Sequence, residues 1–436
     1  MKSIFTKIKT KTKTFTQRFF LTIQLYGENG LANHAAACAY GFLLSIAPML
    51  LLVAFLIFIL FKPSPAAIAS FFGNIPFLDG IFDEKWFSSN LFSGVYPGIS
   101  GIISMLSIIW AARILAVSIQ RGLKIVFPVT KNRNPLSENL VMFVIEAVVI
   151  IFILIIILSS RTALRFYTLL DFFQDISFFQ IITSQTGSRV FSVIILVLVS
   201  YFLYLYVPVK TPRKLSAFQG ALFCVFAYSI TAIALGTILD ISRYNFLYGA
   251  LGNLIILLVN IFFFFNFFFM GAQLIFVTDF FDALYFIKLR QINIKNRTRT
   301  PDLLGKVFYF TDGNSHKNIR QYKKDEIIIS QGDTGDEIYY LLEGEVEVSV
   351  SSVHDNIHSV GILEAGTFFG EMRHLLSDYR CATVSAKTNV TVFVISPHVF
   401  DEILKYDTSV DRYIIEHMSR RLKDITEQIQ RGAIKL

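Results

Sequence analysis

The chain has 436 residues, of which 54% are hydrophobic and 17% are charged, and phenylalanine alone accounts for 45 of them. This composition excludes a soluble enzyme and indicates a protein that lies mostly in a lipid bilayer. The formal net charge of +8 comes from lysines and arginines that cluster between hydrophobic runs, a pattern typical of membrane topology rather than of nucleic-acid binding.

Residues 1–30 form a basic arm at the beginning of the chain. Lysine and arginine alternate there with phenylalanine, and the part that precedes residue 21 has no acidic residue. Such a segment, placed ahead of an apolar run, is typical of a cytoplasmic juxtamembrane arm that lies on anionic lipid. We expect no cleavable signal peptide, because the first apolar run begins late and is long.

Six apolar runs are long enough to cross a bilayer, which takes ~20 residues at a helical rise of 1.5 Å per residue. They cover residues 36–61, 99–120, 140–159, 190–207, 217–239 and 248–277. The sequence therefore predicts an all-α polytopic membrane domain of six transmembrane helices over residues 31–285.

Basic residues in the connections predict the orientation of this domain. Lysine and arginine are concentrated in the N-terminal arm, in the second and fourth connections and after the sixth run, whereas the other connections hold few. By the positive-inside rule, we expect a multi-pass membrane protein with both termini in the cytoplasm.

Four segments of the apolar half carry a family resemblance. They are AAACAYGFLLSIAPMLL (35–51), WAARILAVSIQRGLKIVF (110–127), VPVKTPRKLSAFQGALF (207–223) and YGALGNLIILLVNIFFFFNFFFMGAQL (248–274). These segments resemble the BrkB/YihY family of bacterial inner-membrane proteins, some members of which carry the name ribonuclease BN. The resemblance covers about residues 20–280 and implies six helices, but no agreed activity.

Polar side chains within the predicted spans are costly, so each one needs a reason, and four of them are candidates for a functional role. Arg113 and Glu146 are at matching depth and could pair, either as a structural ion pair that fixes the register of two helices or as part of a proton or anion relay. Asn260 and Asn266 do not share one narrow helical face, and for asparagine between helices a packing role is favoured over a ligand role.

The composition changes after the last apolar run. Residues 286–301 are basic and predict a linker that acts as a hinge on the membrane surface. In residues 302–436, apolar alternation at 327–329, 338–342 and 346–350 is interrupted by glycine-containing turns, which predicts β-strands.

The segment FGEMRHLLSDYRCATVSA (369–386) carries the clearest chemistry. Glu371 lies nine residues ahead of Arg380, with a short helical piece between them. A forked guanidinium and several backbone N–H groups suit the single negative charge of a cyclic phosphodiester. An ionised Glu371 accepts a hydrogen bond from a ribose 2′-hydroxyl, and a glycine at position 370 allows close backbone approach.

This spacing resembles the phosphate-binding cassette of cyclic nucleotide-binding domains, which implies a β-roll with flanking helices over residues 302–436. The resemblance implies that cAMP or cGMP is a regulatory ligand, held by Phe369, Gly370, Glu371, Met372, Arg380, Cys381 and Ala382. The choice of base stays open with cAMP favoured, because Cys381 stands where some family members have a hydroxyl.

Three further positions depart from the family pattern. Asp325 stands where a turn glycine is usual, and Arg373 and His374 replace small or apolar residues in the cassette helix. The spacing of apolar residues in 413–434 predicts an amphipathic terminal helix. The resemblance implies that this helix closes over the base, so its apolar stripe serves as a lid, as the seam of a homodimer or as both.

The fold predicted for the whole chain is an all-α membrane domain followed by a β-roll. We expect a transporter-like membrane activity that is regulated by cytoplasmic cyclic nucleotide. The alternatives are a membrane-bound nuclease and a nucleotide-responsive scaffold. The nuclease is disfavoured, because the seven histidines and three cysteines show no metal-ligand spacing. The expected partners are the lipid bilayer and a cyclic nucleotide, with no metal and no nucleic acid.

Overall fold

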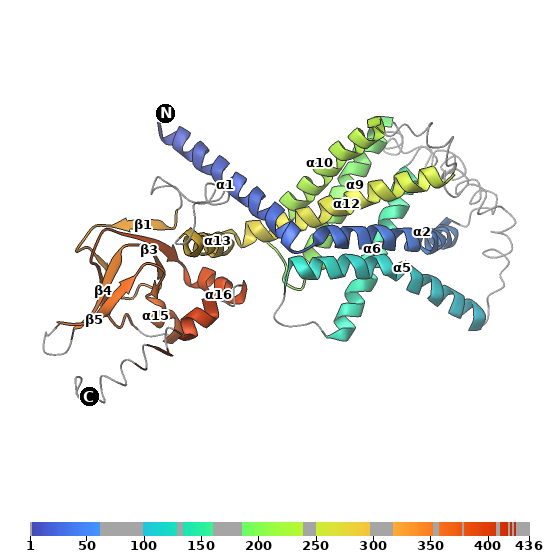
Figure 1. Cartoon of the computed structure of the whole chain (residues 1–436). Helices are drawn as coiled ribbons and strands as arrows, with labels where there is room; N and C mark the ends of the chain where they lie inside the picture. Colours follow the sequence, from blue (N-terminus) through green and yellow to red (C-terminus); the bar gives the residue numbers. More distant parts are fainter. Residues whose placement is uncertain are drawn as a thin grey trace. The chain divides into compact units, whose positions relative to one another are not determined.

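The computed structural model describes residues 2–61, 99–128, 134–159, 185–238, 250–296, 317–351, 357–376, 379–406, 410–416, 419–420 and 423. The chain divides into two compact units (Figure 1). One, the helical unit, comprises Phe19–Asp279. The other, the roll unit, comprises Met1–Arg18 and Phe280–Leu436.

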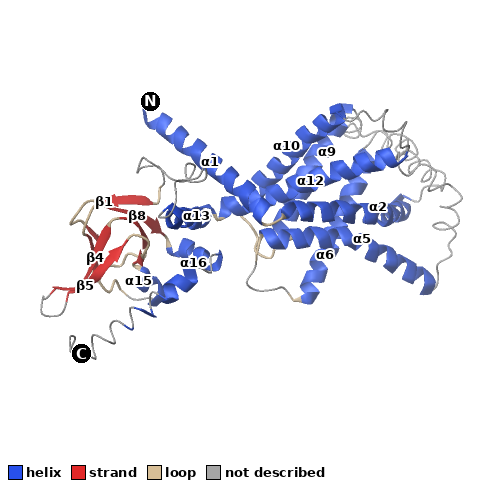
Figure 2. Ribbon diagram, in the orientation of Figure 1, coloured by secondary structure: helices blue, strands red, loops and turns tan. Residues whose placement is uncertain are grey.

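Long helices make up the described part of the helical unit (Figure 2). Their side chains are mostly apolar, and a helix satisfies its own backbone hydrogen bonds, as a segment within lipid must. The helices are α1 (Lys2–Glu28), whose first part belongs to the roll unit, α2 (Leu31–Phe61), α5 (Ile99–Val126), α6 (Pro135–Ser159), α9 (Gln185–Tyr206), α10 (Lys214–Ile238) and α12 (Ala250–Asp279). The predicted basic arm is therefore helical, and its helix ends at Glu28, just before the turn at Gly30, which has a positive φ of 61°.

The predicted apolar runs fall in the helices that follow α1. Among the residues searched, Lys214–Thr237 and Ile255–Asp279 are long and apolar enough to cross a membrane. Leu31–Ile46 and Val190–Tyr206 are shorter apolar helices. The helical character of this half is thus confirmed, whereas the number of six crossings stays a prediction.

Glycines allow α10 and α12 to pack closely. A Cβ added to Gly271 would lie 2.8 Å from the carbonyl oxygen of Gly220 and 2.7 Å from the hydroxyl of Tyr204. That hydroxyl donates to the carbonyl oxygen of Phe268 at 2.6 Å, and the two rings stack with centroids 4.7 Å apart. Backbone-to-backbone contact of this kind is how helices associate where the hydrophobic effect gives little help.

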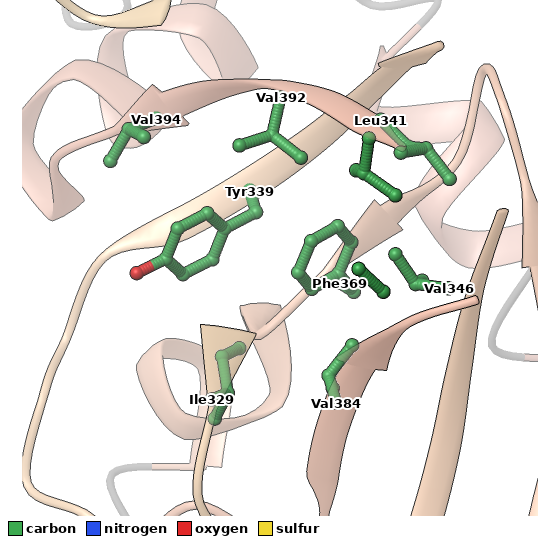
Figure 3. Packing of buried hydrophobic residues seen from close by; sticks show 10 residues of the cluster. Ile329, Tyr339, Leu341, Val346, Phe369, Val384, Val392 and Val394 are labelled. Atoms are coloured by element: carbon green, nitrogen blue, oxygen red, sulfur yellow. The ribbon is translucent and has the colours of Figure 1, made fainter. Parts of the chain in front are cut away.

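The roll unit contains two four-stranded antiparallel sheets, ordered β1-β8-β3-β6 and β2-β7-β4-β5. Its core lies where apolar side chains of both sheets meet, including Tyr339, Phe369 and Val384 (Figure 3). The strands are β1 (Ile319–Tyr322), β2 (Ile327–Ile329), β3 (Ile338–Glu343), β4 (Glu345–Ser351), β5 (Ile357–Glu364), β6 (Phe368–Phe369), β7 (Thr383–Ala386) and β8 (Val390–Ile395). The predicted β-roll is confirmed.

Asp325 forms the turn between β1 and β2 in the left-handed conformation that a glycine would adopt. Its φ is 67°, which aspartate tolerates better than most residues do. The N–H of Asp325 donates to the carbonyl oxygen of Ala386 at 2.7 Å. The replacement of the usual glycine therefore leaves intact the turn that carries the chain from β1 in one sheet to β2 in the other.

Three helices, α13 (Phe281–Asn296), α15 (Glu371–Leu376) and α16 (Pro397–Tyr406), complete the described part of the roll unit together with the helical residues 410–416. Most of the predicted terminal helix, residues 413–434, lies outside the described residues.

Residues 286–296 of the predicted linker belong to α13, which is packed within the roll unit, and the hinge role stays a prediction. Phe286 is fully buried, and its ring centroid lies 5.1 Å from that of Tyr340 and 5.4 Å from that of Phe393. Arg290 is also buried, with its guanidinium 5.4 Å from the ring centroid of Tyr413. Its charge therefore does not mark a solvated linker, because a long basic side chain can pack along apolar surface. Residues 297–316 lie outside the described residues.

Candidate functional site

A cavity of about 80 Å³ lies in the roll unit where β6 leads into α15. Its lining comes from the two ends of the cassette segment and from the strands beside them. All seven residues that the sequence predicted for ligand binding line it, namely Phe369, Gly370, Glu371, Met372, Arg380, Cys381 and Ala382. The structure thus brings these residues together, and their binding role stays a prediction.

Gly370 makes the turn between β6 and α15. Its φ of 80° lies in the left-handed region that favours glycine. A Cβ at this position would lie 2.8 Å from Nη1 of Arg380 and 3.1 Å from Cδ1 of Ile329. Glycine is therefore needed both for the turn and for the space that the guanidinium occupies.

Arg380 is 5% exposed, and its guanidinium is held by backbone carbonyls. Nη1 donates to the carbonyl oxygen of Gly370 at 2.7 Å, and Nη2 donates to that of Glu337 at 2.6 Å. Burial lowers the pKa of Arg380, but a guanidinium stays protonated in folded proteins. These two bonds leave further N–H groups of the guanidinium for an anion, so the cavity holds a fixed positive charge.

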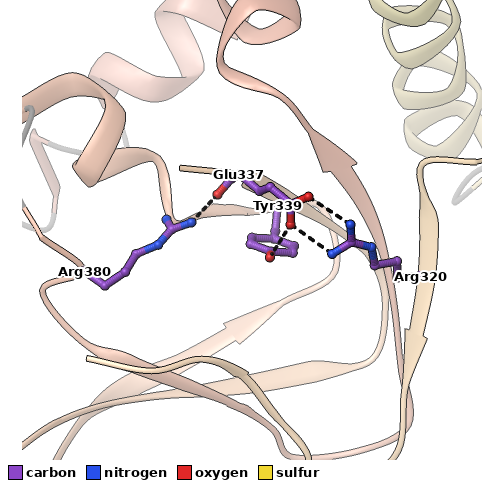
Figure 4. A network of polar contacts seen from close by, with 4 residues as sticks. All are labelled: Arg320, Glu337, Tyr339 and Arg380. Atoms are coloured by element: carbon purple, nitrogen blue, oxygen red, sulfur yellow. Dashed lines mark hydrogen bonds and ion pairs between the residues drawn. The ribbon is translucent and has the colours of Figure 1, made fainter. Parts of the chain in front are cut away.

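Glu337 connects this arginine to a second one (Figure 4). Its carboxylate accepts two hydrogen bonds from Arg320, both at 2.9 Å, and one from the Tyr339 hydroxyl at 2.9 Å. Partial burial would raise the pKa of Glu337, but the bonds from Arg320 and Tyr339 outweigh it and lower the pKa. The Glu337 side chain is thus anchored, which fixes the carbonyl that receives Arg380.

The cassette helix α15 begins at Glu371, which is 3% exposed and lines the cavity. Arg373 also lines the cavity and donates to the carbonyl oxygen of Asp333 at 3.4 Å, so it adds a second positive charge. His374 instead contacts Asp401 of α16 at 2.8 Å, and its ring lies 5.7 Å from that of Phe400. His374, which departs from the family pattern, therefore joins α15 to α16.

The sequence did not predict the part of the lining that comes from the second sheet. Ile329, Val348, Leu363 and Val384 line the cavity from β2, β4, β5 and β7, which together form one sheet. Their period-two alternation was the signal that could have found them.

The polar residues predicted within the spans are not brought together as one site. Arg113 donates to Asn139 at 2.5 Å and lies over the ring of Phe143, and it forms no ion pair with Glu146. Glu146 is 4% exposed, and its Oε2 has no hydrogen-bond partner among the described residues. The guanidinium of Arg113 is bonded instead to an asparagine of α6, and a functional role for the two charged residues stays a prediction.

The two asparagines of α12 make packing contacts. The amides of Asn260 and Asn266 each donate to a carbonyl oxygen one turn earlier, at 2.9 and 2.8 Å. The Oδ1 atom of Asn266 also accepts from the Tyr26 hydroxyl at 2.6 Å. The choice between a packing role and a ligand role for these residues stays a prediction.

Possible metal ligands do not cluster in the described part of the chain, where no group of three or more histidine, cysteine, aspartate or glutamate side chains could hold a metal ion. Cys38 and Cys224 are buried free thiols, and Cys381 is exposed with its Sγ donating to the carbonyl oxygen of Tyr379 at 3.5 Å.

The double-sheet roll, its turn and its buried arginine define a cyclic nucleotide-binding domain, and the family model for that domain matches residues 319–407. The N-terminal part of the chain shows to which family the chain belongs. The chain belongs to the virulence factor BrkB family, whose model matches residues 22–280. Membership implies an inner-membrane protein.

Individual relatives match the roll unit. The cAMP-activated global transcriptional regulator CRP of Salmonella typhimurium is 28% identical over 116 residues, which are 26% of this chain and 55% of that protein. The cAMP-dependent protein kinase regulatory subunit of Candida albicans is 31% identical over 125 residues, 27% of this chain and 26% of that protein. The chain thus spans about half the length of the curated regulators that it matches first.

Solved structures show the same coverage. The catabolite activator protein of Thermus thermophilus is 21% identical, covers 26% of this chain and 54% of its own, and has a TM-score of 0.25.

Proposed function

We propose that this chain is an inner-membrane protein with both termini in the cytoplasm, whose transporter-like activity is regulated by a cyclic nucleotide bound in the cassette cavity. The observation that carries the proposal is the buried charge of Arg380 beside the buried acceptor Glu371 in one cavity. A cyclic phosphate neutralises the guanidinium, and the ribose 2′-hydroxyl donates to the carboxylate.

The base is placed by the apolar lining from the second sheet. Ile329, Val348 and Leu363 offer hydrocarbon surface to a purine ring. Cys381 supplies a thiol that already donates to the carbonyl of Tyr379, so no hydroxyl of that residue serves a guanine. We therefore favour cAMP over cGMP as the ligand.

An aromatic cluster offers a route from the cavity to α13. Phe368 immediately precedes the cavity residue Phe369, and its ring lies 5.7 Å from Phe286 of α13 and 6.0 Å from Phe400 of α16. Only Phe280 separates the end of α12 from the start of α13 in the chain. Nucleotide binding shifts the population of cassette conformations, and the packed helix α13, instead of a loose hinge, transmits the change to α12.

The binding step is tested by calorimetric titration of the full chain in lipid nanodiscs with cAMP and cGMP. Removing the guanidinium with Arg380→Ala should cost ~2–5 kcal/mol, which is at least about tenfold in affinity. Arg412→Ala removes an exposed arginine outside the cavity lining and is the matched control. Equal affinity of the two variants, or no binding by the unmodified chain, would refute nucleotide recognition at this cavity.

The regulatory step needs a readout beyond the cavity. Amide hydrogen exchange, measured with and without cAMP, should change in α13 and in the C-terminal turns of α12. The change should vanish in Arg380→Ala. Protection confined to α15 and the strands would mean that the nucleotide binds without signalling to the helical unit.

A further inference from the structure

A second and larger cavity lies inside the helical unit. Its volume is about 360 Å³, and its lining comes from α2, α5, α6, α9, α10 and α12. Representative contributors are Phe42 of α2, Val149 of α6, and Phe265 of α12. Because every long helix after α1 in the described part of this unit contributes, the cavity is a central feature of the bundle.

The chemistry of the lining excludes an ionic ligand. None of the lining residues carries a charged side chain. The hydroxyl of Ser229 donates to the carbonyl oxygen of Val225 in its own helix at 2.7 Å, and the ring of Tyr228 packs edge-on against Phe264 with centroids 5.4 Å apart. An ion or a nucleotide placed here would lose its hydration without replacement contacts.

The volume indicates a ligand rather than a packing defect. An apolar cavity of ~150 Å³ stays dry and binds a molecule the size of benzene. Ligand pockets occupy roughly 300–1,000 Å³, and this cavity falls within that range. An apolar void of such size left empty forfeits dispersion contacts along its whole lining, so an apolar occupant would stabilise the bundle.

Helix α9 shows where the occupant can enter. Leu196, Val199 and Leu203 line the cavity at the spacing of one helical face. Leu198, on the other side of α9, is 55% exposed, whereas Val193 lines the cavity and is also 45% exposed. The cavity therefore reaches the outer apolar surface of α9 beside Val193. In an inner-membrane protein, such a surface faces the hydrocarbon chains of the bilayer.

We propose that the central cavity binds the hydrocarbon chain of a membrane lipid, which enters beside Val193. The occupant is an acyl chain because the lining is apolar, the opening lies on an apolar helix surface, and acyl chains are the most concentrated apolar species in a membrane. The site is separate from the cassette cavity, and lipid binding there does not depend on cyclic nucleotide regulation.

The test uses the full chain in nanodiscs that contain phosphatidylethanolamine with a photoreactive diazirine on its acyl chain. After irradiation, peptide mass spectrometry locates the labelled residues. The proposal expects labels on Leu196, Val199 or Phe265 in addition to labels on the outward residue Leu198. Labelling of outward residues alone would overturn it.

A matched pair of variants separates cavity occupancy from general lipid contact. Val199→Trp fills the cavity and should reduce labelling of Leu196 and Phe265 at least tenfold, whereas Leu198→Trp, one residue away on the exposed side, should leave it unchanged. Size-exclusion profiles establish that both variants fold, and Leu196→Phe replaces Val199→Trp if that variant does not, with labels then followed at Val199 and Phe265. Cavity labelling that survives in the folded cavity-filling variant would also overturn the proposal.

Discussion

The cassette cavity is small and charged, whereas the central cavity is large and apolar. The cassette cavity is about 80 Å³ and contains Glu371 and Arg380, both nearly buried. The central cavity is about 360 Å³ and has no charged lining residue. Because a buried charge needs a partner whereas apolar surface needs only to be covered, the first suits the charged phosphate of a nucleotide and the second suits a hydrocarbon chain.

The two units also achieve close packing by different means. In the roll unit, aromatic side chains fill the space between α13, α16 and the sheet β1-β8-β3-β6, with Phe286 and Phe368 at the centre. In the helical unit, the absence of side chains at Gly220 and Gly271 lets backbones approach. Truncation of a buried aromatic side chain should therefore destabilise the roll unit, and a side chain added at a glycine should destabilise the helical unit.

Phe286→Ala should have the largest effect. Phe286 is fully buried among Tyr340, Phe368 and Phe393, so its truncation should destabilise the roll unit by ~3–5 kcal/mol. Hydrogen exchange of the β3 and β8 amides in the full chain measures this loss. Ile415→Ala, at a residue that is 65% exposed, should change stability by less than ~0.5 kcal/mol. Unchanged exchange in Phe286→Ala would mean that α13 does not belong to the roll unit.

Gly271→Val tests the opposite sensitivity in the helical unit. The added carbons would meet the backbone of Gly220 and the hydroxyl of Tyr204, and overpacking of this kind costs roughly 1–3 kcal/mol or more. The melting temperature in detergent should fall, while nucleotide affinity should be retained. Gly236→Val is the control, because a Cβ at Gly236 meets nothing within 4 Å. An equal fall in both variants would attribute the effect to helix propensity instead of close packing.

Gly370→Ala separates backbone strain from the space needed by Arg380. Gly370 and Gly366 both have a positive φ, but only a Cβ at Gly370 would meet the guanidinium, because one at Gly366 meets nothing within 4 Å. Both alanine variants should lose ~1–3 kcal/mol of stability from strain. Calorimetry should show about tenfold weaker nucleotide binding for Gly370→Ala alone, equivalent to ~1.4 kcal/mol. Similar affinities in the two variants would show that the guanidinium adjusts its position.

The sequence was sufficient where function depends on residues that are close in the chain. The seven cassette residues lie within one short segment, so their spacing predicted that they would converge. Ile329, Val348, Leu363 and Val384 come from four strands, and their convergence depends on a sheet order that alternation does not reveal.

The depth of a residue in a predicted span and the charge of a segment did not predict which side chains make contact. Arg113 and Glu146 lie at similar depth, but the sequence does not reveal which side chain faces the guanidinium, and Asn139 occupies that place. The basic residues of α13 suggested a solvated segment. Arg290 is nevertheless buried against Tyr413, because its long side chain packs along apolar surface. Both differences arise from tertiary contacts that composition alone cannot specify.

Glu337→Gln should have the smallest effect, and a pH-dependent one. Hydrogen bonds from Arg320 and Tyr339 outweigh partial burial and lower the pKa of Glu337. A lowered pKa means that the ion pair stabilises the fold above the unfolded-state value of about 4.3 and loses this contribution as the pH falls through the folded-state pKa. The side chains of Arg320 and Glu337 are 47% and 38% exposed, so solvent screening limits the contribution to ~1 kcal/mol or less.

The glutamine variant should therefore be slightly less stable than the unmodified chain at neutral pH and equal to it in acid, as measured by hydrogen exchange of the β1 and β3 amides. Glu345→Gln is the control, because its pairing with Lys387 spans a longer 3.9 Å between exposed side chains. A difference that persists in acid would show that Glu337 acts through its shape, by holding the carbonyl that receives Arg380, and not through its charge.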